Sequence, residues 1–151
     1  MPMQAMATLP HDHPLAKQFH GVIDASPADE PKKGWVRLGG PEAIRPGDVF
    51  AWLKPAFWKK RKNTGHVGFV VEKPRPHPTY AGVWLMRIAD ASRYTHEDDT
   101  RPDDGTGGYG TGTIAFLFDG SGQAVAYGWY GSFQEIETYV PTHIVFGRVA
   151  K

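Results

Sequence analysis

A histidine and an aspartate stand out as residues that could do acid–base chemistry together. His66 follows a glycine in "TGHVGFVV" (residues 64–71), and no other polar side chain occurs before Glu72. Asp90 lies in "MRIADAS" (residues 86–92). A carboxylate that accepts a hydrogen bond from one imidazole nitrogen fixes the ring's tautomer and leaves the other nitrogen free to take a proton from a nucleophile. In the alternative interpretation, His66 caps a strand and Asp90 only satisfies it or begins a turn.

The two residues can meet if their segments form an antiparallel hairpin. The connecting loop contains Pro74, Pro76 and Pro78, which have no N–H to donate to a ladder, so pairing should stop near Glu72 and resume near Trp84. With those two residues opposite each other, His66 is predicted to lie opposite Asp90, within hydrogen-bonding reach.

These segments, together with "RPGDVFAW" before them, resemble the NlpC family of papain-like cysteine peptidases and amidases over roughly residues 45–92, and more loosely to Val149. The resemblance implies a papain-like core in which His66 is the base and Asp90 its orienting residue. It also implies hydrolysis of an amide or peptide bond, in cell-wall peptide for example, and a bacterial envelope or secreted role for a longer precursor.

The family's nucleophile is a cysteine at the N-terminus of a helix that precedes the first core strand, and this chain has no cysteine. Three hypotheses remain open: a fragment whose upstream part carries the Cys helix, an inactive homologue that binds a peptide or glycan, or an unrelated β-domain. Hydroxyl substitutes for the thiol, at Thr8, Ser26 or Ser92, follow no glycine-rich elbow or helix start. The chain alone is expected to show no cysteine-peptidase turnover, so whether it is an enzyme stays open.

The densest polar stretch, "SRYTHEDDTR" (residues 92–101), follows directly on Asp90. We predict that Ser92, His96, Asp99 and Arg101 form a substrate-binding rim, with a solvated loop as the plainer alternative. His96, Asp98 and Asp99 also carry ligand atoms for a divalent metal, which keeps a metal-dependent hydrolase as a further alternative. No complete ligand set is evident, the "HDH" of residues 11–13 lies near the terminus, and no metal or other cofactor is predicted.

The elements that must position these residues are mainly strands. Apolar residues recur at helical spacing over 13–23, which predicts one amphipathic helix. Extended segments rich in Val, Ile, Phe, Tyr and Trp are predicted at 35–40, 48–53, 66–72, 84–92, 112–118, 124–130 and 143–149. These segments follow one another at short intervals with no helix between them, which favours antiparallel pairing of the strands. The glycine-rich "TRPDDGTGGYGTGT" (residues 100–113) is predicted to be a flexible loop.

The predicted fold class is therefore α+β, a small antiparallel, barrel-like sheet with one N-terminal helix, corresponding to a truncated NlpC-type core. Residues 1–34 are assigned to the helix and a linker, and residues 35–151 to a single β core. The net charge is +1 with both signs mixed along the chain, apart from "KKRK" at 59–62, so a nucleic-acid partner is not expected. No membrane span or signal peptide is recognised. A peptide or cell-wall peptide is the expected ligand.

Overall fold

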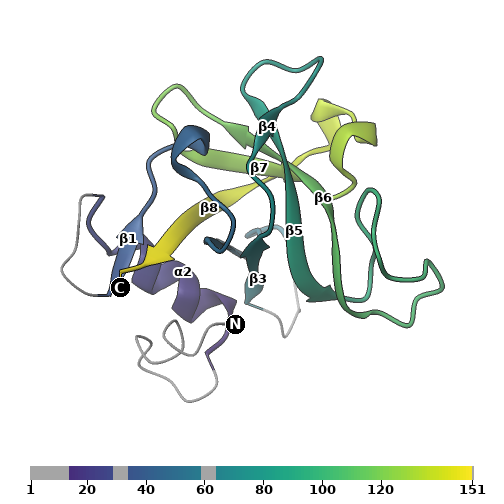
Figure 1. The fold of residues 1–151 in the computed structure, drawn as a ribbon, viewed down its shortest axis with the longest axis horizontal. Coiled ribbons are helices and arrows are strands. Elements are labelled where there is room, and N and C mark those ends of the chain that lie inside the picture. Colours follow the sequence, from purple (N-terminus) through teal and green to yellow (C-terminus); the bar gives the residue numbers. More distant parts are fainter. Residues whose placement is uncertain (1–13, 29–33, 59–63, 151) are drawn as a thin grey trace.

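The computed structural model describes residues 14–28, 34–58 and 64–150, drawn in colour in Figure 1. Thr8, the histidines of residues 11–13 and the basic run 59–62 lie outside the described residues. Helix α2 (Ala16–Asp24) is followed by strands β1 (Trp35–Arg37), β2 (Val49–Leu53), β3 (Gly65–Val70), β4 (Arg75–Pro76), β5 (Val83–Ser92), β6 (Gly108–Phe118), β7 (Ala124–Gly128) and β8 (Val140–Val149). Short 3₁₀ helices occupy Pro41–Ala43, Gly131–Phe133 and Ile136–Thr138.

Six strands form a closed antiparallel barrel in the order β8-β2-β3-β5-β6-β7 (Figure 1). The ring closes because β8 pairs with β2 along one edge and with β7 along the other. Strand β1 extends the sheet on β8, and β4 pairs with β5 outside the ring. The predicted small α+β fold with a barrel-like sheet is thereby confirmed.

Strand β2 is apolar throughout because both of its faces are covered. Phe50 and Trp52 belong to the large cluster that fills the barrel. Val49 and Ala51 point the other way and join a second cluster. Alternate residues of a strand face opposite sides of a sheet, so a strand buried on both sides reads as a continuous apolar run.

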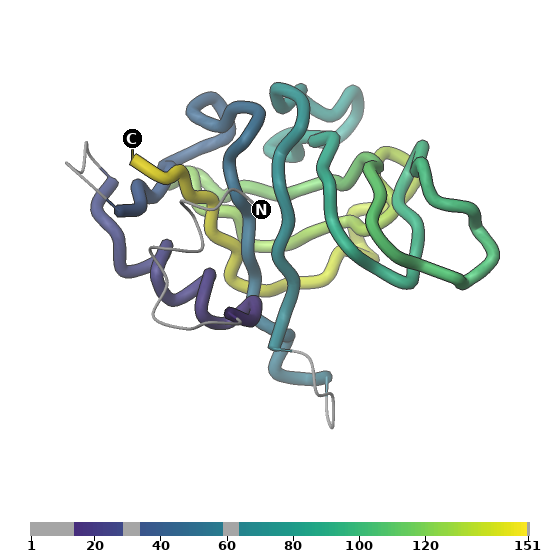
Figure 2. Tube along the Cα trace, turned by 60° about the horizontal axis from the view of Figure 1, so that its bottom comes forward, coloured from purple at the N-terminus to yellow at the C-terminus, as the bar shows by residue number. Residues whose placement is uncertain are grey.

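Helix α2 provides that second cover. Its apolar stripe buries Phe19 and Ile23 against Trp35 and Val145 of the sheet. Figure 2 shows the helix (purple) beside the C-terminal strand β8 (yellow) at one side of the barrel. The predicted helix is confirmed, although it begins at Ala16, two residues beyond Pro14. None of the helices described is long and apolar enough to cross a membrane.

The glycine-rich segment differs from its prediction as a flexible loop. Strand β6 begins at Gly108, so Ser92 pairs with Gly108 and Asp90 with Gly110 in a long β5–β6 ladder. A Cβ at Gly110 would come within 2.6 Å of the Arg101 side chain, and one at Gly112 within 2.8 Å of His96 and Asp99. The missing side chains make room for the chain between β5 and β6 to fold back over the sheet.

Candidate functional site

His66 and Asp90 meet through a hydrogen bond of 2.7 Å between His66 Nε2 and Asp90 Oδ2. The ladder between their strands pairs Phe69 with Ala89, which puts Gly68 rather than His66 level with Asp90. The predicted register is therefore wrong by two residues. A shift of two keeps both side chains on the same face, so His66 reaches Asp90 diagonally.

Two glycines of the "TGHVG" segment allow this approach. Gly65 has φ +142°, and a Cβ there would collide with the carbonyl oxygen of Trp52 on β2. A Cβ at Gly68 would lie 2.7 Å from the carbonyl oxygen of Ala89 and 2.7 Å from the ring of Phe50. Both positions therefore lack the space for a side chain, and His66 stands between two close backbone approaches.

Asp90 is the centre of a buried polar group that we call the Asp90 cluster: His66, Asp90, His96, Asp99 and Arg101. Its Oδ2 accepts from His66 Nε2 and from His96 Nε2, each at 2.7 Å, and its Oδ1 accepts from Arg101 Nη2 at 2.8 Å. Burial alone would raise the pKa of the Asp90 carboxyl, but the hydrogen bonds from His66 and His96 outweigh it and hold the pKa well below its usual value. Asp90 is therefore an anion.

His96 makes a hydrogen-bond contact through each of its ring nitrogens. Its Nδ1 lies 2.9 Å from the carbonyl oxygen of Trp129, and its Nε2 contacts the Asp90 carboxylate. Both partners are oxygen atoms that can only accept a hydrogen bond, so the ring is held at both ends. Within the cluster, the guanidinium of Arg101 lies between the anions Asp90 and Asp99.

Arg101 is fixed by Asp99 as well as by Asp90. Its Nε donates to Asp99 Oδ1 at 2.9 Å and its Nη2 to Asp99 Oδ2 at 2.8 Å, which is a bidentate pair. Hydrogen bonding to Asp99 raises the pKa of Arg101 further above its ordinary value. His66 contacts Asp90 through Nε2, and no hydrogen bond to its Nδ1 is found among the described residues.

His66 faces a cavity of about 380 Å³ that we call the aromatic cavity. Half of the described residues that line it carry indole or phenol rings, and Arg93 is the one Lys or Arg among them. The lining residues are Trp52, Trp58, Gly65, His66, Ser92, Arg93, Tyr94, Tyr127, Trp129, Tyr130, Gln134 and Val140. His66 lies against the rings of Trp52 and Trp129, with centroids 5.1 and 5.2 Å away. A cavity of this size and composition suits a small ligand with planar or apolar groups.

A second, shallower hollow brings the N-terminus of α2 to the other side of His66. Pro14, Leu15 and Ala16 line it together with residues 64–67. The backbone N–H of Lys17 donates to Thr64 Oγ1 at 3.2 Å, which ties the helix start to the residue before Gly65. No residue of the helix start carries a thiol or hydroxyl group.

The predicted substrate-binding residues divide into two groups. Ser92 lines the aromatic cavity. His96, Asp99 and Arg101 do not, because their polar atoms are held inside the Asp90 cluster, where they position Asp90. Their role as a substrate rim stays a prediction without a contact in the cavity to support it.

The other residues considered from the sequence are also placed by the structure. The Ser26 hydroxyl donates to the carbonyl oxygen of Val22 and is away from His66. Asp98 is exposed and pairs with Arg87 at 3.5 Å, so it does not join His96 and Asp99 in a metal site. Among the described residues, the group able to hold a metal ion consists of His20, Asp24 and His143.

Sequence reasoning missed the aromatic side of the site. Trp129 lies in the predicted strand 124–130, and nothing in the sequence pattern sets Tyr94 or Tyr130 apart as ligand-binding residues. Tyr94 and Tyr130 are 63% and 54% exposed and line the aromatic cavity, where their rings offer faces on which a ligand can stack. Tyr94 lies in the polar stretch 92–101, where an aromatic ring has no core to join, whereas Tyr130 ends the predicted strand 124–130 and gives no such signal.

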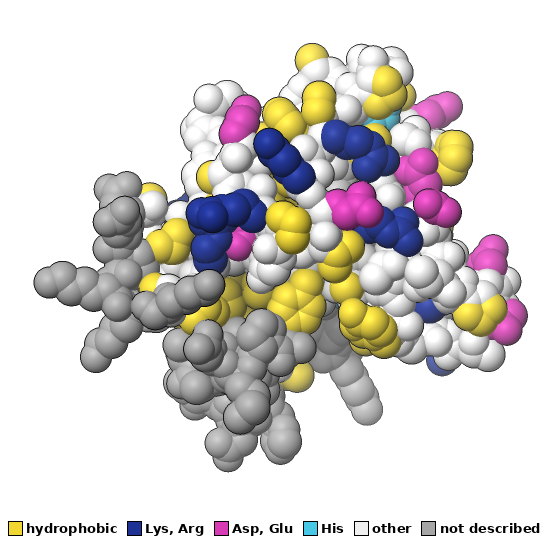
Figure 3. Space-filling model, in the orientation of Figure 1, with side chains coloured by type: hydrophobic (Ala, Val, Ile, Leu, Met, Phe, Trp, Pro, Cys, Tyr) yellow, Lys and Arg dark blue, Asp and Glu magenta, His cyan; other side chains and the backbone are white. Residues whose placement is uncertain are grey.

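The surface charge agrees with the mixed composition. Figure 3 shows Lys and Arg side chains interspersed with Asp and Glu on one face, with apolar groups between them. No protein-family model, curated protein or solved structure matches the chain.

Proposed function

We propose that this protein is a non-catalytic peptide-binding module, an inactive homologue of NlpC-type papain-like hydrolases that binds a peptide or cell-wall peptide in the aromatic cavity. The order of elements supports the relationship. A helix precedes the first core strand, the next strand opens with Gly65 and His66, and the following strand carries Asp90.

One observation carries the proposal: the N-terminus of α2 lies beside His66 and presents Pro14, Leu15 and Ala16. In the family that this chain resembles, the nucleophilic cysteine sits at the N-terminus of the helix before the first core strand. Helix α2 has that position in the order of elements, so the thiol is replaced by apolar groups. This favours an inactive homologue over a fragment that awaits a Cys helix from elsewhere.

The composition of the aromatic cavity supports the ligand class. Rings of Trp and Tyr bind planar amides and apolar side chains at low cost in conformational entropy. Arg93 is exposed at the cavity and has no hydrogen bond or ion pair among the described residues, so its guanidinium is available to bind a carboxylate in bidentate fashion. A peptide that ends in a free carboxylate satisfies both features.

The test is a titration with short peptides, read by intrinsic tryptophan fluorescence, because Trp52, Trp58 and Trp129 line the cavity. Matched peptides with a free and an amidated C-terminus are compared. We expect the free acid to bind more tightly, and Arg93→Gln to remove the difference. Equal binding of both peptides by the wild-type chain would refute the carboxylate preference.

Variants distinguish cavity binding from chemistry at His66. Tyr94→Ala and Tyr130→Ala should each weaken binding by roughly fivefold, since one lost stacking contact is worth about 1 kcal/mol. Phe133→Ala is the matched control, because Phe133 is 81% exposed and does not line the cavity. His66→Ala should retain binding.

Hydrolysis is the second candidate function, and one observation favours it. Nδ1 of His66 has no hydrogen-bond partner among the described residues, as expected of a base that acts on a nucleophile. Mass spectrometry of the same peptides after incubation decides between the two functions. Unchanged peptides support a binding module, whereas cleavage that disappears in His66→Ala establishes a hydrolase.

A further inference from the structure

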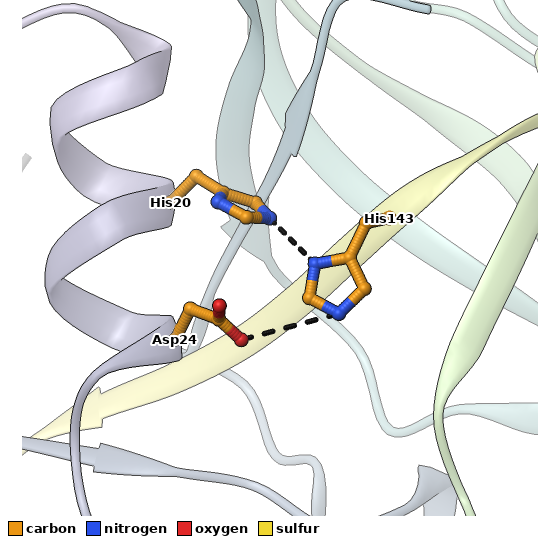
Figure 4. Close-up of side chains that lie close together, drawn as sticks. All are labelled: His20, Asp24 and His143. Atoms are coloured by element: carbon orange, nitrogen blue, oxygen red, sulfur yellow. Dashed lines mark hydrogen bonds and ion pairs between the residues drawn. The ribbon is translucent and has the colours of Figure 1, made fainter.

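Two histidines and an aspartate meet between helix α2 and strand β8, away from the aromatic cavity. His20 and Asp24 are one helical turn apart, so their side chains lie on the same face of α2. His143 projects from β8 toward them, as Figure 4 shows. His20 Nε2 lies 2.8 Å from His143 Nδ1, and Asp24 Oδ1 lies 3.9 Å from His143 Nε2.

The two imidazoles face each other through their nitrogens. A contact of 2.8 Å between two such nitrogens requires that one carries a proton and the other offers a lone pair. His20 is buried, and burial together with the neighbouring His143 lowers its pKa, which favours the neutral ring. Neutral imidazole nitrogens are the ligand form that transition metals require.

We propose that His20, Asp24 and His143 form a binding site for a divalent transition metal of the zinc class. One ligand atom from each residue lies within 4.8 Å of the others. Two histidines and one carboxylate supply a three-residue ligand set, and water completes the coordination. The site differs from the metal alternative considered from the sequence, which involved His96, Asp98 and Asp99.

To admit the ion, the two rings must move apart and the Asp24 carboxylate must come closer to both of them. Two nitrogens bound to one tetrahedral Zn²⁺ at about 2.0–2.1 Å are roughly 3.3 Å apart, so the rings must separate by about half an ångström. His143 is exposed, so its ring can turn to bring one nitrogen to the ion that His20 and Asp24 also bind. The buried His20 remains fixed.

One neighbouring charge opposes the metal. Arg37 Nη1 lies 3.5 Å from Asp24 Oδ1 and competes for that carboxylate. Both groups are partly exposed, so this ion pair is weak and should yield to a metal ion. Replacing Arg37 with glutamine removes the competition, and metal affinity should rise.

Bound metal would join α2 to β8. The helix otherwise depends on the apolar contacts of Phe19 and Ile23, and its N-terminus lines the hollow beside His66. A metal bridge between His20 and His143 therefore stabilises the folded state through linkage, and the melting temperature should rise with metal concentration.

The experiment is a calorimetric titration of the full chain with ZnCl₂, combined with a thermal melt. The titration uses a His11→Ala/His13→Ala background, because those histidines could bind zinc independently. We expect one Zn²⁺ per chain and a higher melting temperature with zinc than with a chelator. If this variant does not bind Zn²⁺ at a 1:1 ratio, the proposal is overturned.

Variants assign the ligands. Asp24→Asn and His143→Ala change exposed side chains, so the fold should survive, and each should weaken zinc binding by roughly tenfold or more. Glu137→Gln is the control for an exposed carboxylate elsewhere and should change nothing. The visible spectrum of the Co²⁺-substituted protein gives a second readout of nitrogen coordination. Zinc binding that persists unchanged in both ligand variants would overturn the assignment.

Discussion

His66 reaches the Asp90 carboxylate across a diagonal of the β3–β5 ladder, with 2.7 Å between Nε2 and Oδ2. The residue level with Asp90 is Gly68, which has no side chain to intervene. The orientation of His66 thus depends on a buried anion, which His96 and Arg101 hold from the other side.

Loss of the Asp90 charge should destabilise the protein strongly. Asp90→Asn replaces an acceptor with an amide and leaves two buried donors, on His96 and Arg101, without their anion. Breaking a buried ion pair costs about 3–5 kcal/mol, so we expect the free energy of unfolding to fall by about that amount in urea denaturation. Asp98→Asn, whose side chain is 90% exposed, should change it by less than about 0.5 kcal/mol. Similar values for both variants would contradict the central role of Asp90.

The glycines beside His66 should not tolerate alanine. Gly65→Ala and Gly68→Ala each place a Cβ against backbone atoms of a neighbouring strand, and we expect losses of roughly 2 kcal/mol or more. Gly21→Ala is the matched control, because Gly21 lies on an open face of α2 where alanine favours the helix by about 0.5–1 kcal/mol. Thermal melts compare the three variants, and wild-type stability of Gly68→Ala would show that the close approach is wrong.

A cysteine placed at the start of α2 should become reactive. Leu15→Cys puts a thiol in the hollow beside His66, where the helix N-terminus and the imidazole favour the thiolate. Because the natural chain has no cysteine, alkylation by iodoacetamide reports on this thiol alone. We expect the midpoint of its pH–rate profile about one unit below that of Gly21→Cys in the middle of the helix.

The same profile tests the part that His66 plays. Adding His66→Ala to Leu15→Cys should move the midpoint back toward the ordinary thiol value of about 8.5. A midpoint that does not respond to His66 would mean that the helix start and His66 do not form the arrangement that the family uses.

The contact between His66 and Asp90 was predicted correctly from the sequence, although the predicted register of their strands was wrong by two residues. Alternation along strands fixed their common face, and this is insensitive to a slip of two residues. The loop after Glu72 was expected to be unpaired because of its prolines, yet Arg75 and Pro76 pair with Leu85 and Trp84 at the outer edge, where a missing N–H is tolerated. The prolines therefore predicted the start of β5 to within one residue but missed the short strand β4 inside the loop.

The rest of the site depends on tertiary packing that local patterns do not reveal. Gly108, Gly110 and Gly112 suggested a flexible loop, whereas they form a strand whose absent side chains accommodate His96, Asp99 and Arg101. The sequence predicts those three polar residues as a substrate rim because their polar stretch follows directly on Asp90. In the structure their polar atoms contact Asp90 and one another. This inward orientation depends on tertiary contacts and cannot be predicted from the local sequence.

The stability of the chain should depend on pH through His20. Burial, followed by the proximity of His143, lowers the pKa of His20 below its ordinary value of 6.5, while Arg37 lowers it and Asp24 raises it by smaller amounts. The unfolded state then binds the proton more readily. This contribution to stability is fully present above about pH 6.5 and is lost as the pH falls through the lower folded-state pKa.

Urea denaturation between pH 5 and 8, with a chelator present, measures this dependence. His20→Gln should show a flatter profile than the wild-type chain over the acidic part of the range. Parallel profiles for the two proteins would show that His20 does not carry the pH dependence.

The most direct test of the proposed function is a ¹H–¹⁵N NMR titration of the chain with short peptides that end in a free carboxylate, followed by mass spectrometry of the peptides. A binding module predicts saturable shifts of the indole signals of Trp52, Trp58 and Trp129, smaller shifts for Trp35 and Trp84 outside the cavity, and intact peptides at the end. Unperturbed cavity signals, or peptide cleavage that requires His66, would contradict the account.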